Sequence, residues 1–252
     1  MTFKPAILTP TRGRPGRLDT FVASVFSTAT IPVFMFNYID SDDPRIIAYR
    51  DYEQCYEKGH IINIYGEPKS VSQSWNDLAK KAIEHGCDPL IMGNDDLVYR
   101  TKDWNNILRR KIEPYKDQIY CAWFEDKING PNHCAFPIVS KKWVDTLGYF
   151  TPGIFNFGYN DTWVFDIAKR IDRTVFIPDV VAEHMHFTAG KSAMDETYHH
   201  NRTRERGNLY EKDRVIFENT VGDREAAAKK LREQISEWQR QKDYDGTMFY
   251  TQ

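Results

Sequence analysis

Two adjacent carboxylates follow an apolar run in the stretch PLIMGNDDLVYR, Pro89 to Arg100. Asp95 and Asp96 repel each other and resist burial, so a strand that ends on both needs a compensating charge. A hard divalent cation such as Mg²⁺ or Mn²⁺ supplies that charge, because it takes oxygen ligands from one or two carboxylates and the others from substrate phosphates. The structural alternative is that Asn94 and Asp95 make a turn or cap a helix beginning near Lys102.

A second polar stretch, TPTRGRPGR, follows the first apolar run of the chain and is rich in hydroxyl and guanidinium groups. Such groups bind a nucleotide or its phosphates. The stretch matches neither GxGxxG nor GxxxxGK[ST], so it is not a dinucleotide fingerprint or a P-loop. Its alternative interpretation is a solvated basic turn. The side chains concerned are Thr9, Thr11, Arg12, Arg14 and Arg17.

Short apolar runs that alternate with helix-like segments must position these residues. In Ser70 to His85, apolar side chains recur on one helical face and Gly86 supplies a stop. Alternating strands and helices predict an α/β fold with a mostly parallel sheet, in which ligands bind beyond the carboxyl ends of the strands. The runs predicted to be buried strands are Ala6 to Pro10, Ile31 to Asp40, His60 to Gly66, Pro89 to Asp95 and Gln118 to Phe124.

The second half of the chain is less regular. Stretches rich in Gly, Pro and Asn predict loops that carry aromatic residues, and Asp161 to Asp172 predicts a helix. Thr174 to Phe187 predicts a further strand, and Asp223 to Arg240 predicts a last amphipathic helix. We therefore expect one domain with a C-terminal extension.

Composition limits the class of protein. The 252 residues, 41% of them hydrophobic, are enough for one large α/β domain, and the net charge of -2 gives no overall basic field. The four cysteines form no CxxC pair, and the N-terminal stretch lacks a long apolar core. These features predict reduced thiols in a cytoplasmic protein. No apolar run reaches the ~18 residues that cross a bilayer, so we expect no membrane span.

The order of the motifs resembles the nucleotide-sugar glycosyltransferases of the GT-A type, close to the small inverting enzymes and to soluble ones encoded by tailed phages. The residues that carry the resemblance are PTRGRP, the acidic DSDD, SQSWNDLAKKA, GNDD, FNFGYND and EHMHFTAGK, and it spans roughly Ala6 to Lys191. It implies a GT-A (Rossmann-like) domain over residues 1–190. Residues 1–100 would bind the nucleotide sugar and 101–190 the acceptor, and 191–252 would form a C-terminal extension with a helix.

The resemblance also implies roles at the metal. Asp96 would hold it, and Asp95 would contact the ribose or sugar, although Asn94 departs from the first aspartate of the DxD-like motif. His184 and His186 alternate on one strand face, so either would complete the metal shell or contact the diphosphate. Lys191 would neutralise the departing diphosphate.

The remaining donor contacts implied by the resemblance lie on other strand ends. Asp40 would read the nucleobase, with Asp42 or Asp43 as alternatives and helix capping before Pro44 as a structural explanation. The full set expected to bind the donor is Thr9, Pro10, Thr11, Arg12, Asp40, Asn76, Asn94, Asp95 and Lys191.

Asp161 occupies the place where inverting members keep a general base, which takes the proton from the acceptor hydroxyl. Its structural alternative is an N-cap for a helix beginning at Thr162. The expected reaction is a metal-dependent, inverting transfer of a sugar from a nucleoside diphosphate sugar, with a uridine donor expected.

The acceptor suggested by the phage resemblance is DNA that carries hydroxymethylated pyrimidines, which places the protein in the host cytoplasm. The aromatic stretch Tyr149 to Trp163 would stack on a base, and HHNRTRERGN with Lys141 and Lys142 would contact phosphates. Surface polysaccharide or protein are alternative acceptors. A nucleotidyltransferase and a non-catalytic carbohydrate-binding protein are the competing classes, and the oligomeric state stays open.

Overall fold

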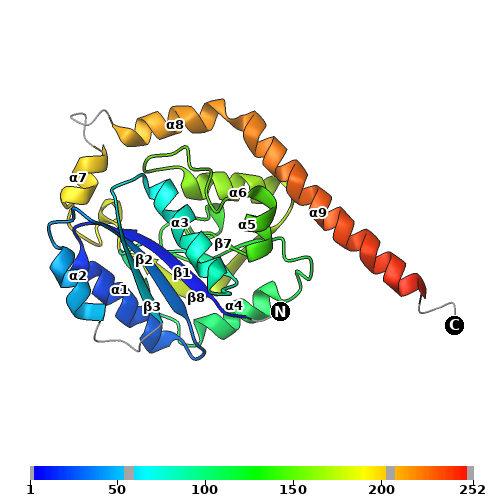
Figure 1. Cartoon of the computed structure of the whole chain (residues 1–252), viewed down its shortest axis with the longest axis horizontal. Helices are drawn as coiled ribbons and strands as arrows, with labels where there is room; N and C mark the ends of the chain where they lie inside the picture. The colour runs from blue at the N-terminus through cyan, green and yellow to red at the C-terminus, as the bar shows by residue number, and fades with distance from the viewer. Residues whose placement is uncertain (1–2, 54–59, 203–207, 249–252) are drawn as a thin grey trace.

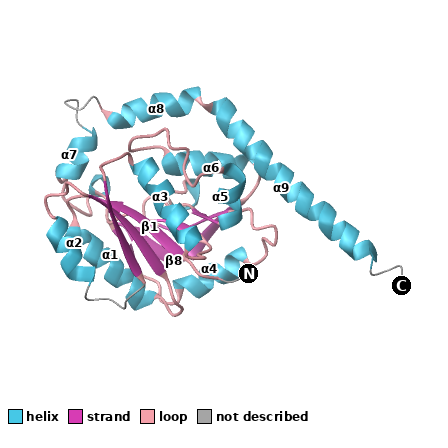
Figure 2. Cartoon of the chain, viewed as in Figure 1, coloured by secondary structure: helices cyan, strands magenta, loops and turns pink. Residues whose placement is uncertain are grey.

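A sheet of eight strands forms the centre of the computed structural model, which describes residues 3–53, 60–202 and 208–248. Helices cover both faces of the sheet (Figures 1 and 2). The strand order is β3-β2-β1-β4-β7-β6-β8-β5. The strands are β1 (Ala6–Thr11), β2 (Phe34–Asp40), β3 (Ile61–Gly66), β4 (Leu90–Met92), β5 (Leu97–Tyr99), β6 (Cys121–Glu125), β7 (Ile138–Val139) and β8 (Thr174–His184).

Most strands run in the same direction. β1 to β4 are parallel, and both β4 and β6 are antiparallel to β7, so β6 has the direction of β4. β8 is parallel to β6, and β5 is antiparallel to β8. The predicted α/β fold with a mostly parallel sheet is therefore confirmed. The carboxyl ends of β1, β2, β4, β6 and β8 lie at one edge, called here the carboxyl edge.

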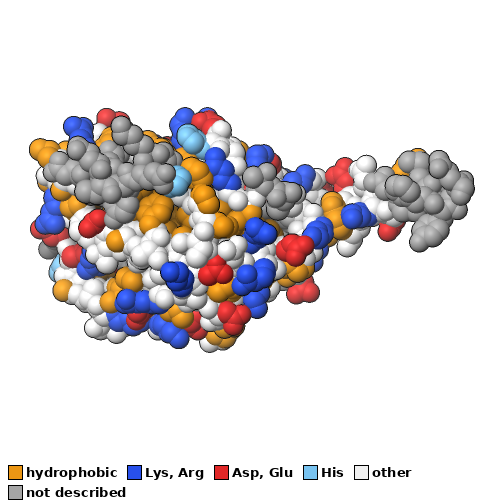
Figure 3. All heavy atoms as spheres, turned by 90° about the horizontal axis from the view of Figure 1, so that it is seen from below, with side chains coloured by type: hydrophobic (Ala, Val, Ile, Leu, Met, Phe, Trp, Pro, Cys, Tyr) orange, Lys and Arg blue, Asp and Glu red, His pale blue; other side chains and the backbone are white. Residues whose placement is uncertain are grey.

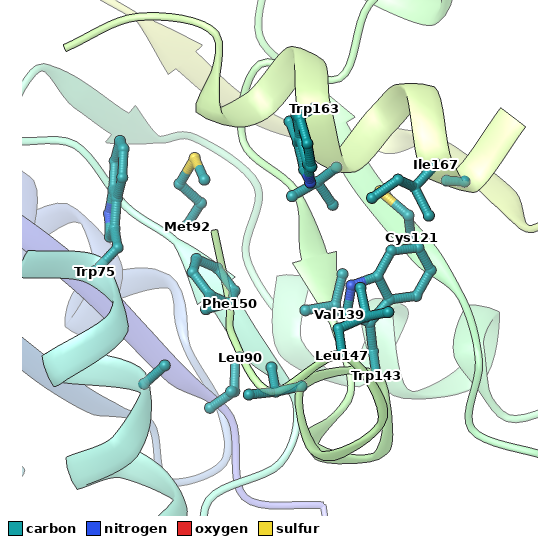
Figure 4. Close-up of a cluster of buried hydrophobic side chains, with 14 of the residues drawn as sticks. Trp75, Leu90, Met92, Cys121, Val139, Trp143, Leu147, Phe150, Trp163 and Ile167 are labelled. Atoms are coloured by element: carbon teal, nitrogen blue, oxygen red, sulfur yellow. The ribbon is translucent and has the colours of Figure 1, made fainter. Parts of the chain in front are cut away.

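Alternate residues of each strand pack on opposite faces of the sheet, as the strand period requires. Ile7 and Met35 contact the layer of α1 (Pro15–Thr28), α2 (Ile46–Glu53) and α4 (Trp104–Ile112). Leu8 and Phe36 contact the layer of α3 (Val71–Glu84), α5 (Lys141–Leu147) and α6 (Asn160–Arg170). Figure 4 shows part of this second layer. The prediction of a helix in the α3 segment is confirmed, and Ser70 Oγ caps it by accepting from Gln73 N at 3.2 Å.

The C-terminal extension contains α7 (Glu196–Arg202), α8 (Leu209–Asn219) and α9 (Val221–Met248), which follow the 3₁₀ turn Phe187–Ala189. α9 extends beyond both predicted ends and packs on α5 and α6 through Ala227, Ala228, Leu231 and Ile235. Its last turns project from the body of the molecule (Figures 1 and 3). In the described ranges we find no helix with the length and apolar character of a membrane span.

Candidate active site

The turn between β4 and β5 brings Asp96 to a histidine from the other half of the chain. β5 pairs with β8 so that Leu97 lies opposite His184, and Met185 N donates to the carbonyl of Asp96 at 2.8 Å. The Asn94 carbonyl accepts from Leu97 N at 3.2 Å, and Asn94 Oδ1 accepts from Asp95 N at 3.0 Å, so the turn interpretation of Asn94 is correct. The capping alternative is wrong, because α4 begins after Asp103.

Gly93 lets this turn approach β1 closely. A Cβ atom at this position would lie 2.6 Å from both Ile7 Cγ2 and Thr9 Oγ1, closer than packed atoms tolerate. Thr9 itself is fully buried, and its hydroxyl has no hydrogen-bond partner. The contact of the turn with β1 therefore requires glycine, and Thr9 packs against Gly93, next to the aspartates in the chain.

Asp95 is bound by the loop that follows β1. Thr11 Oγ1 donates to Oδ2 at 2.7 Å, and Arg14 Nη1 donates to Oδ1 at 3.0 Å. Asp95 and Arg14 are 3% and 8% exposed. Burial raises the pKa of Asp95, and the charge of Arg14 opposes that rise. The compensating charge for Asp95 is therefore an arginine, and both of its carboxylate oxygens already have partners.

Asp96 has a different environment. Tyr198 of α7 donates its hydroxyl proton to Oδ2 at 2.5 Å. Oδ1 lies 3.3 Å from His184 Nε2, but the contact lacks hydrogen-bond geometry, so both buried atoms are without a hydrogen-bond partner. Burial acts to raise the pKa of Asp96, but His184 and Tyr198 hold this pKa below its ordinary range. The carboxylate is therefore ionised at neutral pH and keeps one free oxygen.

Asp96 Oδ1 and His184 Nε2 fit a shared divalent cation. Two atoms at right angles on one cation, with bonds of ~2.1 Å, lie about 3 Å apart, close to the 3.3 Å separation found here. The described residues contain no group of three or more His, Cys, Asp or Glu side chains able to hold a metal. Oxygens from water or a substrate would therefore complete the shell, as is usual for Mg²⁺.

His186 lies beside this pair rather than on the same strand face. β8 ends at His184, and the two imidazole centres are 4.9 Å apart. The Nδ1 atom of His186 lies 2.7 Å from Thr188 Oγ1 and accepts from Thr188 N at the start of the 3₁₀ turn. The predicted alternation on one strand is therefore wrong, although both imidazoles reach the same region.

Residues Asp195–Tyr198, at the start of α7, cover Asp95 and Asp96. Asp195 binds Arg14 Nη2 at 2.7 Å and lies 3.2 Å from Arg17 Nη2. The guanidinium of Arg14 also lies over the Tyr198 ring, 4.3 Å from its centre. Sequence reasoning missed both residues, because they belong to a polar stretch without apolar periodicity. The segment places one carboxylate on two arginines, which is the contact that an anionic ligand would make.

Arg12 and Asp40 meet at the ends of β1 and β2. Arg12 Nη1 donates to Asp40 Oδ2 at 2.8 Å and also binds Asp42. Burial raises the pKa of Asp40, and Arg12 opposes the rise. Asp43 holds the turn before α2, because its carboxylate accepts from Arg45 N at 2.8 Å and Gly13 N at 2.6 Å. The side chain of Asp40 makes no such backbone contact in the described residues, and its described partner is Arg12.

Two other expected donor residues have structural partners. Asn76 accepts from the backbone of Phe150 and Thr151 at 2.9 and 3.0 Å and donates to the Thr151 carbonyl at 2.9 Å, so its amide holds that loop. Lys191 donates to Glu183 Oε1 at 2.9 Å, next to His184. Pro10 lies within β1.

Asp161 pairs with a histidine that the sequence did not reveal. His133 Nε2 lies 2.8 Å from Asp161 Oδ2. The N-cap alternative for Asp161 is wrong, because α6 begins at Asn160 and Tyr159 occupies the N-cap position. A histidine in the loop after β6 was the available signal, since that loop starts at the carboxyl edge.

Asp126 connects this pair to the metal-ligand candidates. Its carbonyl accepts from His184 N at 3.0 Å. Its carboxylate accepts from Ile128 N at 2.9 Å and Asn129 N at 2.7 Å, which shapes the loop leading to His133. One ordered loop therefore extends from the backbone of His184 to the side chain that binds Asp161.

The aromatic stretch expected to stack on an acceptor is mostly core. Phe150, Phe155 and Trp163 are at most 2% exposed, and Figure 4 shows Phe150 and Trp163 within the buried cluster. Tyr159 is partly exposed but packs on the rings of Tyr210 and Phe217 at 5.1 and 5.3 Å. The prediction of a long stacking surface is therefore wrong for the buried members.

No protein-family model matches the chain, and no curated protein matches its sequence. Solved structures do match. The mannosyltransferase PcManGT from Pyrobaculum calidifontis, in complex with GDP-Man and Mn²⁺, has a TM-score of 0.56 at 10% identity over 93% of this chain and 75% of that one. TarS residues 1–349 from S. aureus have a TM-score of 0.54 at 12% identity over 90% and 81%.

A complex of the same TarS fragment with UDP-GlcNAc has a TM-score of 0.56 at 10% identity, over 78% of this chain and 64% of that one. At these low identities the TM-scores show a shared fold and no more. With its mixed sheet, its two helical layers and its polar carboxyl edge, the chain has the GT-A fold of nucleotide-sugar glycosyltransferases.

Proposed function

We propose that the protein is a glycosyltransferase that moves a sugar from a nucleoside diphosphate sugar to an acceptor hydroxyl, with Mn²⁺ or Mg²⁺ held by Asp96 and His184. The observation that carries this proposal is the pair of buried, unpartnered atoms Asp96 Oδ1 and His184 Nε2, 3.3 Å apart at the carboxyl edge of a GT-A fold. The complexes of structural neighbours with GDP-Man and Mn²⁺ and with UDP-GlcNAc support it.

The residues around this pair suit a diphosphate leaving group. When bound, the cation would stabilise charge that develops on the phosphate oxygens. Arg14 and Arg17, which now bind Asp195, would donate to phosphate oxygens once that carboxylate is displaced. Lys191, paired with Glu183, adds a further positive charge beside His184. We assign Asp161 as the general base that takes the acceptor's proton in an inverting transfer.

For the donor we propose a uridine nucleotide, read by Asp40 at the end of β2 and Arg12 after β1. Their contact of 2.8 Å gives a charged, partly exposed pair where the base would lie. This part of the proposal extends the sequence resemblance, and the TarS complexes with UDP and UDP-GlcNAc are consistent with it.

For the acceptor we propose a hydroxymethylated pyrimidine in DNA. The support is the resemblance to phage enzymes. Lys141 and Lys142, which were expected to contact phosphates, do not lie at the carboxyl edge. They begin α5 after β7, beside Asp88 at the opposite edge of the sheet, and Lys141 pairs with Asp145. The basic run at 199–208 lies largely outside the described residues. On the face in Figure 3, basic and acidic side chains are interspersed, so phosphate contacts would depend on a few local residues. Surface polysaccharide or protein are the other acceptors to test.

A panel of nucleotide sugars tests the proposal. The wild-type protein would be incubated with each donor, with Mn²⁺ or with excess chelator, and with or without DNA containing hydroxymethylcytosine. We expect mass spectrometry to show one hexose or pentose added to the DNA, only with metal. Calorimetric affinity for the donor that is equal in chelator would exclude the metal role. Transfer to glycosides or polysaccharide but never to DNA would exclude the acceptor and leave the transferase.

A further inference from the structure

The carboxylate of Asp161 is bound asymmetrically. Oδ2 contacts His133 Nε2 at 2.8 Å, whereas Oδ1 has only a long contact of 3.4 Å with Thr162 Oγ1. The side chains of His133 and Asp161 are 30% and 26% exposed, so solvent and an acceptor can reach the pair. One oxygen is therefore fixed by the imidazole, and the other is left for a proton.

We propose that His133 is the positioning residue of the general base, which orients Asp161 through Oδ2 and sets the pH dependence of transfer. This inference rests on the proposed function and adds to it a residue in the loop after β6. His133 is held in place independently of Asp161, because the Asp126 carboxylate shapes the loop and the His133 ring packs edge-on against Phe165, 5.7 Å between centres.

The proton balance of the step is simple. The acceptor oxygen forms a bond to the anomeric carbon while its O–H bond breaks, and the proton moves to Asp161 Oδ1. The bond between the sugar and the phosphate oxygen breaks, and its electron pair leaves with the nucleoside diphosphate. His133 keeps its Nε2–H hydrogen bond to Oδ2 throughout and neither gains nor loses a proton in this step.

Several charged groups act on His133. Burial lowers its pKa, but the neighbouring Asp161 and Asp126 raise it and Lys169 on α6 lowers it, so the net pKa lies above its ordinary value of 6.5. Cys134, which follows His133 in the chain, is a buried thiol 3.8 Å from the buried thiol of Cys121. A protonated imidazole weakens the carboxylate as a base, whereas a neutral imidazole with hydrogen on Nε2 keeps the bond. Transfer should therefore accelerate as pH rises through the raised pKa of His133.

Two substitutions separate positioning from charge. His133→Leu removes the hydrogen bond, and we expect kcat to fall roughly tenfold to hundredfold, as it does for residues that orient metal ligands, with the donor KM unchanged. His133→Gln keeps an N–H donor but no titrating group. Its kcat should be reduced only severalfold, and the pH step should disappear. His85→Gln, on the exposed end of α3, is the control and should keep the wild-type pH profile.

Coupling to Asp161 is tested in a double mutant. If His133 acts only through Asp161, adding His133→Leu to the Asp161→Asn protein should lower kcat little further. Wild-type kcat and pH profile in His133→Leu, beside an inactive Asp161→Asn protein, would overturn the inference and leave the proposed function intact.

A measurement that needs no turnover distinguishes failure of the His133 inference from failure of the proposed glycosyltransferase function. In NMR titrations the His133 imidazole should have a raised pKa in the wild-type protein and a lower one in Asp161→Asn. The same pKa in both proteins would show that the pair does not act as described, whatever the activity. A lowered pKa in a protein that transfers no sugar from any donor would instead contradict the glycosyltransferase proposal.

Discussion

Asp96 and Asp161 lie at the same edge of the sheet but in opposite environments. The Asp96 side chain is fully buried and is contacted by residues from β8 and α7. The Asp161 side chain is about a quarter exposed and has one close partner. The difference shows how the edge is divided: the carboxylate suited to a cation is enclosed and fixed before any ligand arrives, whereas the carboxylate suited to a proton stays accessible to an acceptor.

Of the substitutions that test this division of the edge, Asp96→Asn should have the largest effect. The amide keeps the shape and still accepts from Tyr198, but it removes the charge that would bind the cation. We expect Mn²⁺-dependent donor binding to disappear and transfer to fall at least ~10²–10³-fold, as when one key electrostatic group is lost. Calorimetry with and without Mn²⁺ measures binding, and circular dichroism checks the fold. Metal-dependent binding at wild-type strength in this variant would remove Asp96 from the site.

Asp161→Asn should change proton transfer from the acceptor but not the cation site at Asp96. Base catalysis contributes ~10²–10⁴-fold, so we expect kcat to fall within this range while donor affinity stays near that of the wild type. The wild-type product should have the anomeric configuration opposite to that of the donor, as read by NMR. Retention of configuration, or normal turnover in the variant, would exclude Asp161 as the base and reopen the choice of mechanism.

Asp195→Asn tests whether the carboxylate of Asp195, at the start of α7, competes with an anionic ligand for the two arginines. The amide removes the charge that now pairs with Arg14 and Arg17, so nucleoside diphosphate affinity should rise by about two- to fivefold, equivalent to about 0.5–1 kcal/mol for a partly exposed ion pair. Asp179→Asn, whose carboxylate pairs with Lys111 at 3.0 Å on the exposed surface, is the matched control. Weaker binding by Asp195→Asn would mean that Asp195 helps to hold the ligand.

Asp88, just before β4, extends the comparison because it is a half-buried carboxylate that forms no ion pair with the described residues. Burial raises its pKa from 3.8 to about 6, and its described hydrogen bond is from Lys141 N at 3.0 Å. Because the folded pKa lies above the unfolded one, ionisation destabilises the native state as pH rises from about 4 to above 6. We expect Asp88→Asn to be about 1–2 kcal/mol more stable at pH 8 and equal to the wild type near pH 4.

Urea unfolding at both pH values would check this. Asn keeps the acceptor for Lys141 N, so the comparison at pH 4 controls for packing. A gain of the same size at both pH values would show that charge is not the cause.

The sequence was most informative where periodicity reflects burial. β1, β2, β3, α3 and β8 all lie within or close to their predicted ranges, because apolar runs and an amphipathic face are local features. β5 and β7 were not predicted, since two or three residues carry no measurable period. α7 and α8 were not predicted either, because tertiary contacts hold these polar helices. An example is buried Asp213, which accepts from Phe157 N and Gly158 N at 2.7 and 2.9 Å.

The same reasoning explains what was missing at the site. Adjacency in NDD identifies two carboxylates but not their partners, and only the folded chain shows that Arg14 binds Asp95 while Tyr198 and His184 adjoin Asp96. His133 becomes informative only when α6 places Asp161 beside it. Contacts between residues distant in sequence leave no local pattern. The sequence could therefore indicate the carboxyl edge and its chemistry, but not which side chains there bind one another.

The position of Tyr198 in the chain also sets an order of assembly. Tyr198 lies 102 residues after Asp96, and all eight strands are complete at His184, before α7 begins at Glu196. During synthesis the sheet can therefore form while the two aspartates and Arg14 still face water, and loop closure over such a separation comes late. The covering of this edge by α7 can therefore follow the formation of the sheet, and Tyr198 reaches Asp96 only after the strands that hold it are in place.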